Sequence, residues 1–184
     1  MARNVAEAFG KRPKITEYWD AHDRYSVAIA AGTDVPTEGI TAYSTVNLSD
    51  WPMYVDGREH ETRVEIAASA PSQIEDFEST LSTAAFYVIN GRWPCHPGVV
   101  YPDVLAIYQM SATMKHVLFM GPTGFNNKFD ESLQLPDRLV TWVMMIPIAD
   151  SEYEFAKARG GEALIQILQD RDADYWDLKR KPLV

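Results

Sequence analysis

The segment from Leu139 to Ile148 constrains the fold more than any other part of this chain, because it is apolar except for Thr141 and Pro147. A strand covered on both faces loses the alternation of polar and apolar residues, since each face meets a hydrophobic layer. Its apolar run from Val143 to Ile148 is far too short to cross a lipid bilayer, which takes about 20 residues in a helix. The segment therefore predicts a central strand with structure packed on both sides of the sheet.

Other segments alternate polar and apolar residues with a period of two, which is typical of strands that bury one face. The longest alternation of this kind runs from Ile40 to Leu48. Short apolar segments in the second half of the chain are also strand-like. The further predicted strands are Ile15 to Trp19, Tyr25 to Ile29, Ile40 to Leu48, Thr62 to Ser69, Val104 to Tyr108 and Lys115 to Met120.

Helices are predicted where apolar residues recur at helical spacing after a capping residue. The strongest pattern begins at Gln73, where Ser72 and Glu75 are spaced as a reciprocal capping box. Ser151 and Glu154 form a second pair with this spacing. The predicted helices are Val5 to Lys11 capped by Asn4, Gln73 to Ile89, one that starts at Ser151 and ends before Gly160-Gly161, and Ala163 to Gln169.

The order of these elements indicates an α+β domain. Strands dominate the first third, one long helix follows, strands resume, and helices close the chain. This order fits a central mixed, largely antiparallel β-sheet with helices packed on it. A length of 184 residues fits one domain, so we expect residues 1–184 to form a single unit, with a helix and less regular strands over residues 1–38.

The charge of the chain restricts its partners. It carries 26 acidic against 17 basic residues, a net charge of -9. Nucleic acids and anionic membranes both require clustered Lys and Arg, so neither is an expected partner. A basic protein partner is compatible with this charge, because opposite fields speed encounter. The acidity can equally serve solubility alone.

Cys95 is the single cysteine, so the sequence allows neither an internal disulfide nor a cysteine-based zinc site. The first residues, from Met1 to Glu7, lack the apolar stretch of a secretion signal, and we therefore expect a cytoplasmic protein.

The sequence contains no convincing catalytic motif and no convincing metal-binding motif. Cys95 and His96 are adjacent, and neighbouring residues rarely place their side chains in mutual contact as nucleophile and base. The acidic run that starts at Asp170 imitates a calcium loop, but Tyr175 and Lys181 stand where that loop needs glycine and glutamate. We expect no catalytic residue, metal or cofactor. An acid–base role for the nearby carboxylates of Glu59, Glu61 and Glu65 stays open as an alternative. Carboxylates on a strand usually pair with arginine, and Arg63 is present to do so.

The C-terminal part of the chain interleaves acidic and aromatic residues. Aromatic anchors inside a charged rim are typical of protein interfaces. The alternative is that the aromatic side chains only dock the tail on the domain. The predicted partner-binding residues are Glu152, Tyr153, Glu154, Glu162, Asp170, Asp172, Asp174, Tyr175 and Trp176.

An ordered set of short motifs resembles the Suppressor-of-Fused (SUFU) domain family, especially its short bacterial members. The resemblance spans about Ile40 to Lys181, and it departs from the family where Val46 or Asn47 replaces a glycine and Ile66 replaces a leucine. The motifs are Ser44 to Ser49 before Pro52-Met53, Arg63 to Ile66, Trp93 to Gly98 with His96-Pro97-Gly98, Met145 to Ile148 followed by Glu152, Glu154, Gly160 and Leu164, and Arg180 in the tail.

The resemblance implies a mixed-sheet, sandwich-like domain without enzymatic activity. Larger members of the family sequester a transcription factor by binding it, and bacterial members often accompany toxins as immunity proteins. It therefore implies an immunity protein or antitoxin that binds a toxin, with a basic nuclease domain as the obvious partner. Two alternatives stay open, a small hydrolase built from dispersed carboxylates and His96 and a general regulatory scaffold.

Overall fold

A single β-sheet organises the molecule. The computed structural model describes residues 1–123, 125, 128–129 and 132–184, and within these residues eight strands join one sheet. Seven follow the order β1-β2-β3-β6-β10-β8-β7, and β9 pairs with β10. A separate hairpin joins β4 (Tyr54–Val55) to β5 (Arg58–Glu59). The sheet strands are β1 (Lys14–Trp19), β2 (Ser26–Thr33), β3 (Ile40–Thr45), β6 (Thr62–Pro71), β7 (Val100–Tyr101), β8 (Met114–Met120), β9 (Leu133–Gln134) and β10 (Leu139–Ala149).

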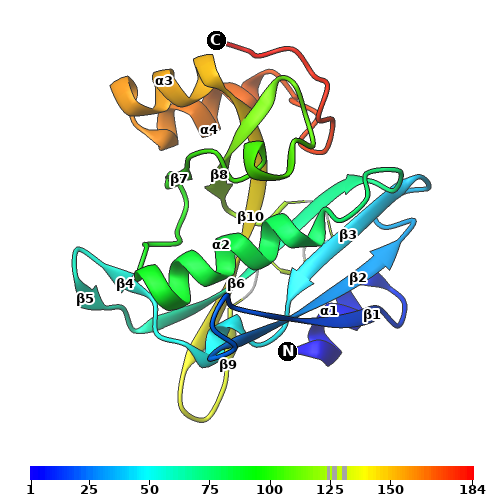
Figure 1. The fold of residues 1–184 in the computed structure, drawn as a ribbon, viewed down its shortest axis with the longest axis vertical. Helices are drawn as coiled ribbons and strands as arrows, with labels where there is room; N and C mark the ends of the chain where they lie inside the picture. The colour runs from blue at the N-terminus through cyan, green and yellow to red at the C-terminus, as the bar shows by residue number, and fades with distance from the viewer. Residues whose placement is uncertain (124, 126–127, 130–131) are drawn as a thin grey trace.

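Strand β10 lies at the centre of the sheet, as the apolar segment predicted (Figure 1). It runs parallel to β6, with Val143 beside Ile66, and antiparallel to β8, with Ile146 beside Leu118. The other strand pairs of the sheet are antiparallel. The predicted fold class, an α+β domain with a mixed and largely antiparallel sheet, is therefore confirmed.

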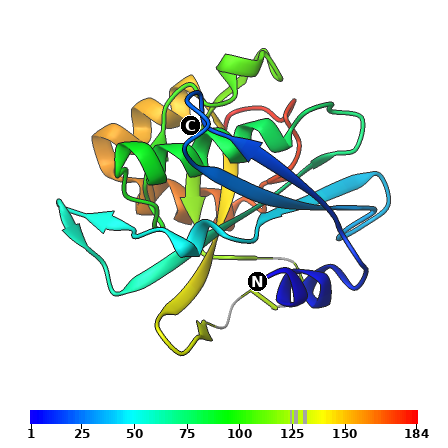
Figure 2. The same cartoon turned by 60° about the horizontal axis from the view of Figure 1, so that its bottom comes forward.

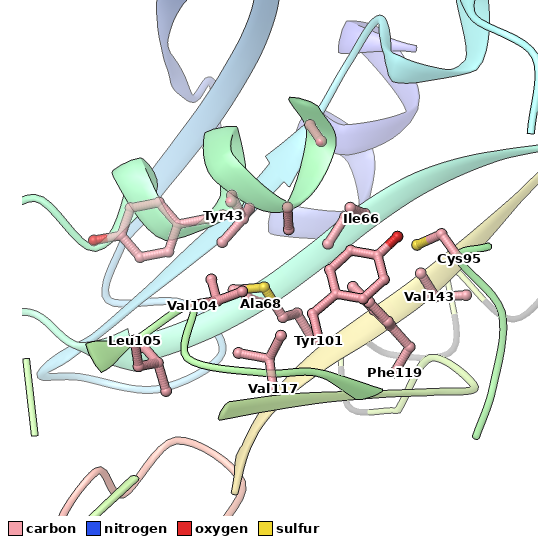
Figure 3. Packing of buried hydrophobic residues seen from close by; sticks show 14 of the residues in the cluster. Tyr43, Ile66, Ala68, Cys95, Tyr101, Val104, Leu105, Val117, Phe119 and Val143 are labelled. Carbon is pink, nitrogen blue, oxygen red and sulfur yellow. The ribbon is translucent and has the colours of Figure 1, made fainter. Parts of the chain in front are cut away.

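Helices cover both faces of the sheet (Figures 1 and 2). On one face, α2 (Glu78–Gly91) packs on a core that includes Ile66 and Val143, and Figure 3 shows these side chains beneath the helix. On the other face, Trp142 and Met144 of β10 join a second core. That second core is covered by α1 (Ala2–Phe9), α3 (Asp150–Arg159) and α4 (Gly161–Asp170).

The structure corrects the start of the long helix, which begins at Glu78 and not at Gln73. Asp76 has a backbone φ of +57°, a left-handed conformation that interrupts a right-handed helix. The Ser72 hydroxyl lies 2.8 Å from the Thr41 hydroxyl of β3, so it is engaged with the sheet and does not cap α2.

The segment from Val104 to Tyr108 was predicted as a strand, and this prediction is wrong. Its end forms a short 3-10 helix, η2 (Ala106–Tyr108), between left-handed residues at Asp103 and Gln109. Val104 and Leu105 are fully buried, so their apolar character anchors a turn to the core.

Two further boundaries differ from the sequence prediction. The first helix starts at Ala2, which leaves Asn4 inside the helix, and ends at the left-handed Gly10. Strand β3 ends at Thr45 because the Asn47 side chain accepts a hydrogen bond from the Ala28 amide (2.7 Å) and the chain then turns into η1 (Leu48–Asp50).

Among the described residues, no helix has the length and apolar character needed to span a membrane.

Candidate partner-binding surface

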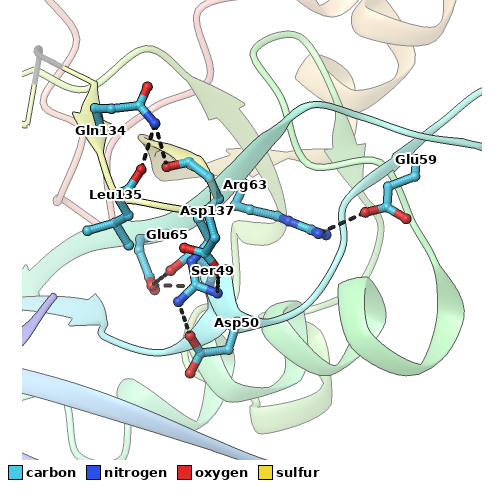
Figure 4. A network of polar contacts seen from close by, with 9 residues as sticks. Ser49, Asp50, Glu59, Arg63, Glu65, Gln134, Leu135 and Asp137 are labelled. Carbon is cyan, nitrogen blue, oxygen red and sulfur yellow. Dashed lines mark hydrogen bonds and ion pairs between the residues drawn. The ribbon is translucent and has the colours of Figure 1, made fainter.

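Two of the motifs that resemble the SUFU family, Ser44 to Ser49 and Arg63 to Ile66, meet in the interior around the carboxylate of Glu65 (Figure 4). Glu65 is fully buried and accepts hydrogen bonds from the Thr45 hydroxyl (2.5 Å) and the Ser49 hydroxyl (2.7 Å). The backbone N–H groups of Leu48 and Ser49 also donate to it, at 3.2 and 3.1 Å. Burial raises the pKa of Glu65, although all four donors act to lower it. Glu65 therefore fixes the turn after β3.

The other carboxylates of this region do not gather into an acid–base site with Glu65. Glu59 and Glu61 are exposed, and Glu59 pairs with Arg63 at 2.7 Å (Figure 4). The pairing with Arg63 that the sequence suggested is therefore present. The three side chains differ in burial and in partners, which argues against a shared catalytic role.

His96 lines a cavity of about 450 Å³ where its loop meets the start of α4. Its Nδ1 atom lies 2.9 Å from the Pro97 carbonyl oxygen. Of the described residues that line this cavity, Glu162 alone carries a carboxylate. A hydrolase that uses His96 with two carboxylates would need a second acidic group here, so the geometry does not favour that alternative.

A second buried carboxylate, Glu152, joins α3 to the C-terminal tail. It is 0% exposed, and the two guanidinium nitrogens of Arg180 donate to its two oxygens at 2.6 and 2.9 Å. The backbone N–H groups of Ala149 and Leu183 complete the cage, at 2.9 and 3.0 Å. Arg180 also donates to the carbonyl of Pro147 at 3.0 Å. These groups enclose the Glu152 side chain, so its carboxylate is not exposed on the surface where the sequence placed a partner contact.

Glu152 also explains why α3 starts where it does. The predicted capping pair was Ser151 with Glu154, but the carboxylate that accepts a bond from the N-terminal end of the helix, at the Ala149 amide, belongs to Glu152. Ser151 instead donates to the Val184 carbonyl at 2.6 Å. The Ser151 contact therefore holds the tail against the first turn of α3.

Tyr153 is half-buried beside His116. Their ring centroids are 4.5 Å apart, and the Lys157 ammonium lies 4.7 Å from the Tyr153 centroid. His116 is held at both ring nitrogens, by the Asp103 amide (2.9 Å) and the Asp150 carboxylate (2.9 Å). Tyr153 therefore packs on the His116 ring, whose position is fixed by two hydrogen bonds, and only part of the Tyr153 ring is exposed to solvent.

Six of the eight remaining predicted residues fall into two groups. Glu162 and Tyr153 lie near Gly98, where the loop after α2 meets α4. The second group surrounds a turn of the tail, and its members are Asp172, Asp174, Tyr175 and Trp176. Glu154 and Asp170 are exposed on α3 and α4, where Glu154 pairs with Lys157 at 2.7 Å and Asp170 accepts from Gln166 at 2.7 Å.

The tail turn is well defined by its own hydrogen bonds. The Asp174 carboxylate accepts from the Trp176 and Asp177 amides, at 3.3 and 3.2 Å. Tyr175 packs against the second core, and burial together with the nearby Asp172 carboxylate raises its pKa. Tyr175 therefore docks the tail, as the alternative interpretation held, whereas Trp176 is half-buried and borders two cavities.

Comparison with known proteins agrees with this architecture. The sequence model of the family described as Suppressor of fused protein (SUFU) matches residues 19–181. Immunity protein YqcF from Bacillus subtilis (strain 168) is 36% identical over 184 residues, which cover 100% of this chain and 95% of that protein.

Solved structures with low identity share the fold. A SUFU homologue from Neisseria gonorrhoeae FA 1090 superposes with a TM-score of 0.67 at 15% identity and covers 100% of this chain and 96% of its own. A chain from the crystal structure of the Sufu–Fu complex gives a TM-score of 0.68 at 12% identity, with coverage of 99% and 90%. The match of the family model over most of the sequence identifies this chain as a member of the Suppressor of fused family.

Proposed function

We propose that this protein is an immunity protein that neutralises a cognate toxin by binding it directly. The observation that carries the proposal is the 36% identity to Immunity protein YqcF, which extends over the whole of this chain. A match over the full length covers the surface of the protein as well as its core. Binding functions depend on surface residues and not on the fold alone.

The interior of the protein supports binding over catalysis. Glu65 is buried and accepts hydrogen bonds from Thr45 and Ser49. Glu152 and Arg180 are buried and are hydrogen-bonded to each other. A catalytic acid or base must reach the substrate within hydrogen-bond distance, which these enclosed groups do not. These three polar residues therefore stabilise the fold, and we expect the binding function to depend on residues of the outer surface.

The C-terminal surface supports a basic partner. Five of the predicted residues are exposed acids, and the whole chain has a net charge of -9. An acidic surface accelerates encounter with a positively charged protein. Nucleases need a cationic groove for the phosphate backbone, so a nuclease toxin domain is the partner class that suits this field. The exposed acids are Glu154, Glu162, Asp170, Asp172 and Asp174.

The decisive experiment is co-expression with the product of the neighbouring gene, tested as the candidate toxin. We expect the full-length protein to restore growth of cells that express the toxin domain and to co-purify with that domain as a complex. The complex should weaken as the NaCl concentration rises, because exposed charges are screened by salt. A protein that neither rescues growth nor co-purifies would refute the proposal. Rescue without a stable complex would refute the direct-binding mechanism.

A further inference from the structure

Trp176 contributes to the lining of two surface cavities. The first has a volume of about 390 Å³ and lies where the end of α1 meets the loop after β2. Its apolar lining includes Phe9, Val35 and Phe125, and Asp34 supplies a carboxylate. Phe9 and Phe125 pack on each other with ring centroids 5.9 Å apart, so the floor of this cavity is built from side chains that support one another.

The second cavity, which also has Trp176 in its lining, has a volume of about 320 Å³. Met144 of the central strand provides its apolar floor, and Asp172 and Asp174 provide two carboxylates. We name the two cavities that share Trp176 the Trp176 groove. Each part of the groove therefore combines apolar surface with negative charge.

The three carboxylates of the groove retain oxygens that can accept further hydrogen bonds. Asp34 accepts from the Gly39 amide at 2.9 Å through Oδ1, and Asp174 uses its own Oδ1 for two backbone amides. Among the residues that the structure describes, the ion pairs involve other acids and none of these three. Within the described part of the chain, none of the three is therefore held in an ion pair.

Lysine and arginine side chains match this combination of features. Each carries an apolar stem that packs on aromatic and aliphatic surface and a cationic head that pairs with a carboxylate. The face of a tryptophan ring also attracts a cation directly. A neutral apolar segment would leave three carboxylates facing it without compensation, which is unfavourable in an interface.

We propose that the Trp176 groove receives Lys or Arg side chains from a basic segment of the partner protein, one on each side of the Trp176 ring. This inference rests on the proposed function, because it assigns the contact through which the toxin is bound. It also adds residues that the C-terminal sequence pattern does not contain, since Asp34 and Phe9 come from the first fifth of the chain.

The groove can be tested first with a defined probe, a hepta-arginine peptide, with a hepta-glutamate peptide of equal length as the charge control. The five tryptophan indole N–H signals are followed by NMR, and Trp176→Phe assigns one of them. We expect hepta-arginine to shift the Trp176 signal and to leave the signal of the exposed Trp93 unchanged. Hepta-glutamate should shift neither. Equal shifts at both tryptophans would overturn the proposal.

A matched pair of triple variants separates the groove from net charge. Asp34→Asn, Asp172→Asn and Asp174→Asn remove its three charges and keep an oxygen for the local backbone bonds. Asp23→Asn, Asp56→Asn and Asp76→Asn remove as many charges from exposed residues that share the left-handed backbone of Asp34 and Asp172. We expect at least a tenfold loss of hepta-arginine affinity in the first variant only. Equal losses of hepta-arginine affinity in the two triple variants, or no loss in either, would overturn the proposal that the groove binds cationic side chains.

The same variants in the toxin assay distinguish failure of the groove from failure of the proposed function. If the groove variant protects cells as well as the wild-type protein, the groove is not the toxin contact and the immunity function stands. If the wild-type protein binds the peptide through Trp176 but never binds the toxin, the proposed function fails while the cation-binding groove stands. Loss of protection in the groove variant alone supports both.

Discussion

Glu65 and Glu152 are both fully buried carboxylates, yet the protein accommodates them in opposite ways. Glu65 is surrounded by neutral donors, two hydroxyls and two backbone N–H groups. Glu152 has a full positive charge against it, the Arg180 guanidinium, with backbone N–H groups as additional donors. Neutral donors compensate a buried charge less completely than a cation does. This is why burial still raises the pKa of Glu65.

The comparison shows that polar residues of the motifs that resemble the SUFU family hold distant segments together. Glu65 fastens the turn after β3, and Glu152 fastens the tail to the start of α3. Both networks lie inside the fold. The exposed carboxylates, such as Asp172, differ from these two because water solvates them. Replacing an exposed carboxylate leaves no buried hydrogen-bond donor without an acceptor.

Removal of Arg180 should have the largest effect on stability. Arg180→Met leaves the Glu152 charge buried without its cation, and breaking a buried pair of this kind costs about 3–5 kcal/mol. Urea unfolding of the purified protein measures the change. Lys179→Met is the matched control, because Lys179 is the exposed neighbour in the same tail. A loss no greater than that of the control would mean that the pair contributes little to the fold.

Glu65→Gln should destabilise the protein by a smaller amount, about 1–3 kcal/mol. Each Glu65 oxygen accepts from one backbone N–H, and the amide NH₂ that replaces one oxygen cannot accept this bond. A buried backbone donor is then left without a partner. Thermal and urea unfolding measure the loss, with the exposed Glu61→Gln as the control. Equal stability of the two variants would show that the turn tolerates an unsatisfied donor.

The pH dependence of stability should sharpen the same comparison. The pKa of Glu65 is raised above its ordinary value of 4.5, so its contribution to stability is complete below that value and is lost as pH rises through the folded pKa. The difference in unfolding free energy between wild type and Glu65→Gln should therefore widen from pH 7 down to about pH 4.5. A difference that narrows over this range would contradict the raised pKa.

Asp172→Asn should have the smallest effect. Asp172 is exposed with a left-handed backbone, which asparagine also tolerates, so the unfolding free energy should change by no more than about 0.5 kcal/mol. Urea unfolding beside Arg180→Met provides the measurement. A loss comparable to that of Glu65→Gln would mean that Asp172 stabilises the fold as the buried carboxylates do.

Local sequence patterns predicted those parts of the fold in which burial leaves a clear composition. The central strand was evident because both of its faces are covered. The start of α2 was misplaced because Ser72, although correctly spaced for capping, is bonded to Thr41, 31 positions away in the chain. In the candidate site, Asp172, Asp174 and Trp176 were predicted, but Asp34 and Phe9 carried no local signal of a surface role.

The sequence by itself determined the segments that enter the core, the excess of negative charge and membership of the family. Only the tertiary structure decided which acidic residues remain outside. Glu152 and Glu154 are two positions apart on the same helix, but Glu152 is enclosed by Arg180 and Glu154 is exposed. The reason is that burial of a charge depends on which distant groups reach it, and a local sequence pattern does not specify those groups.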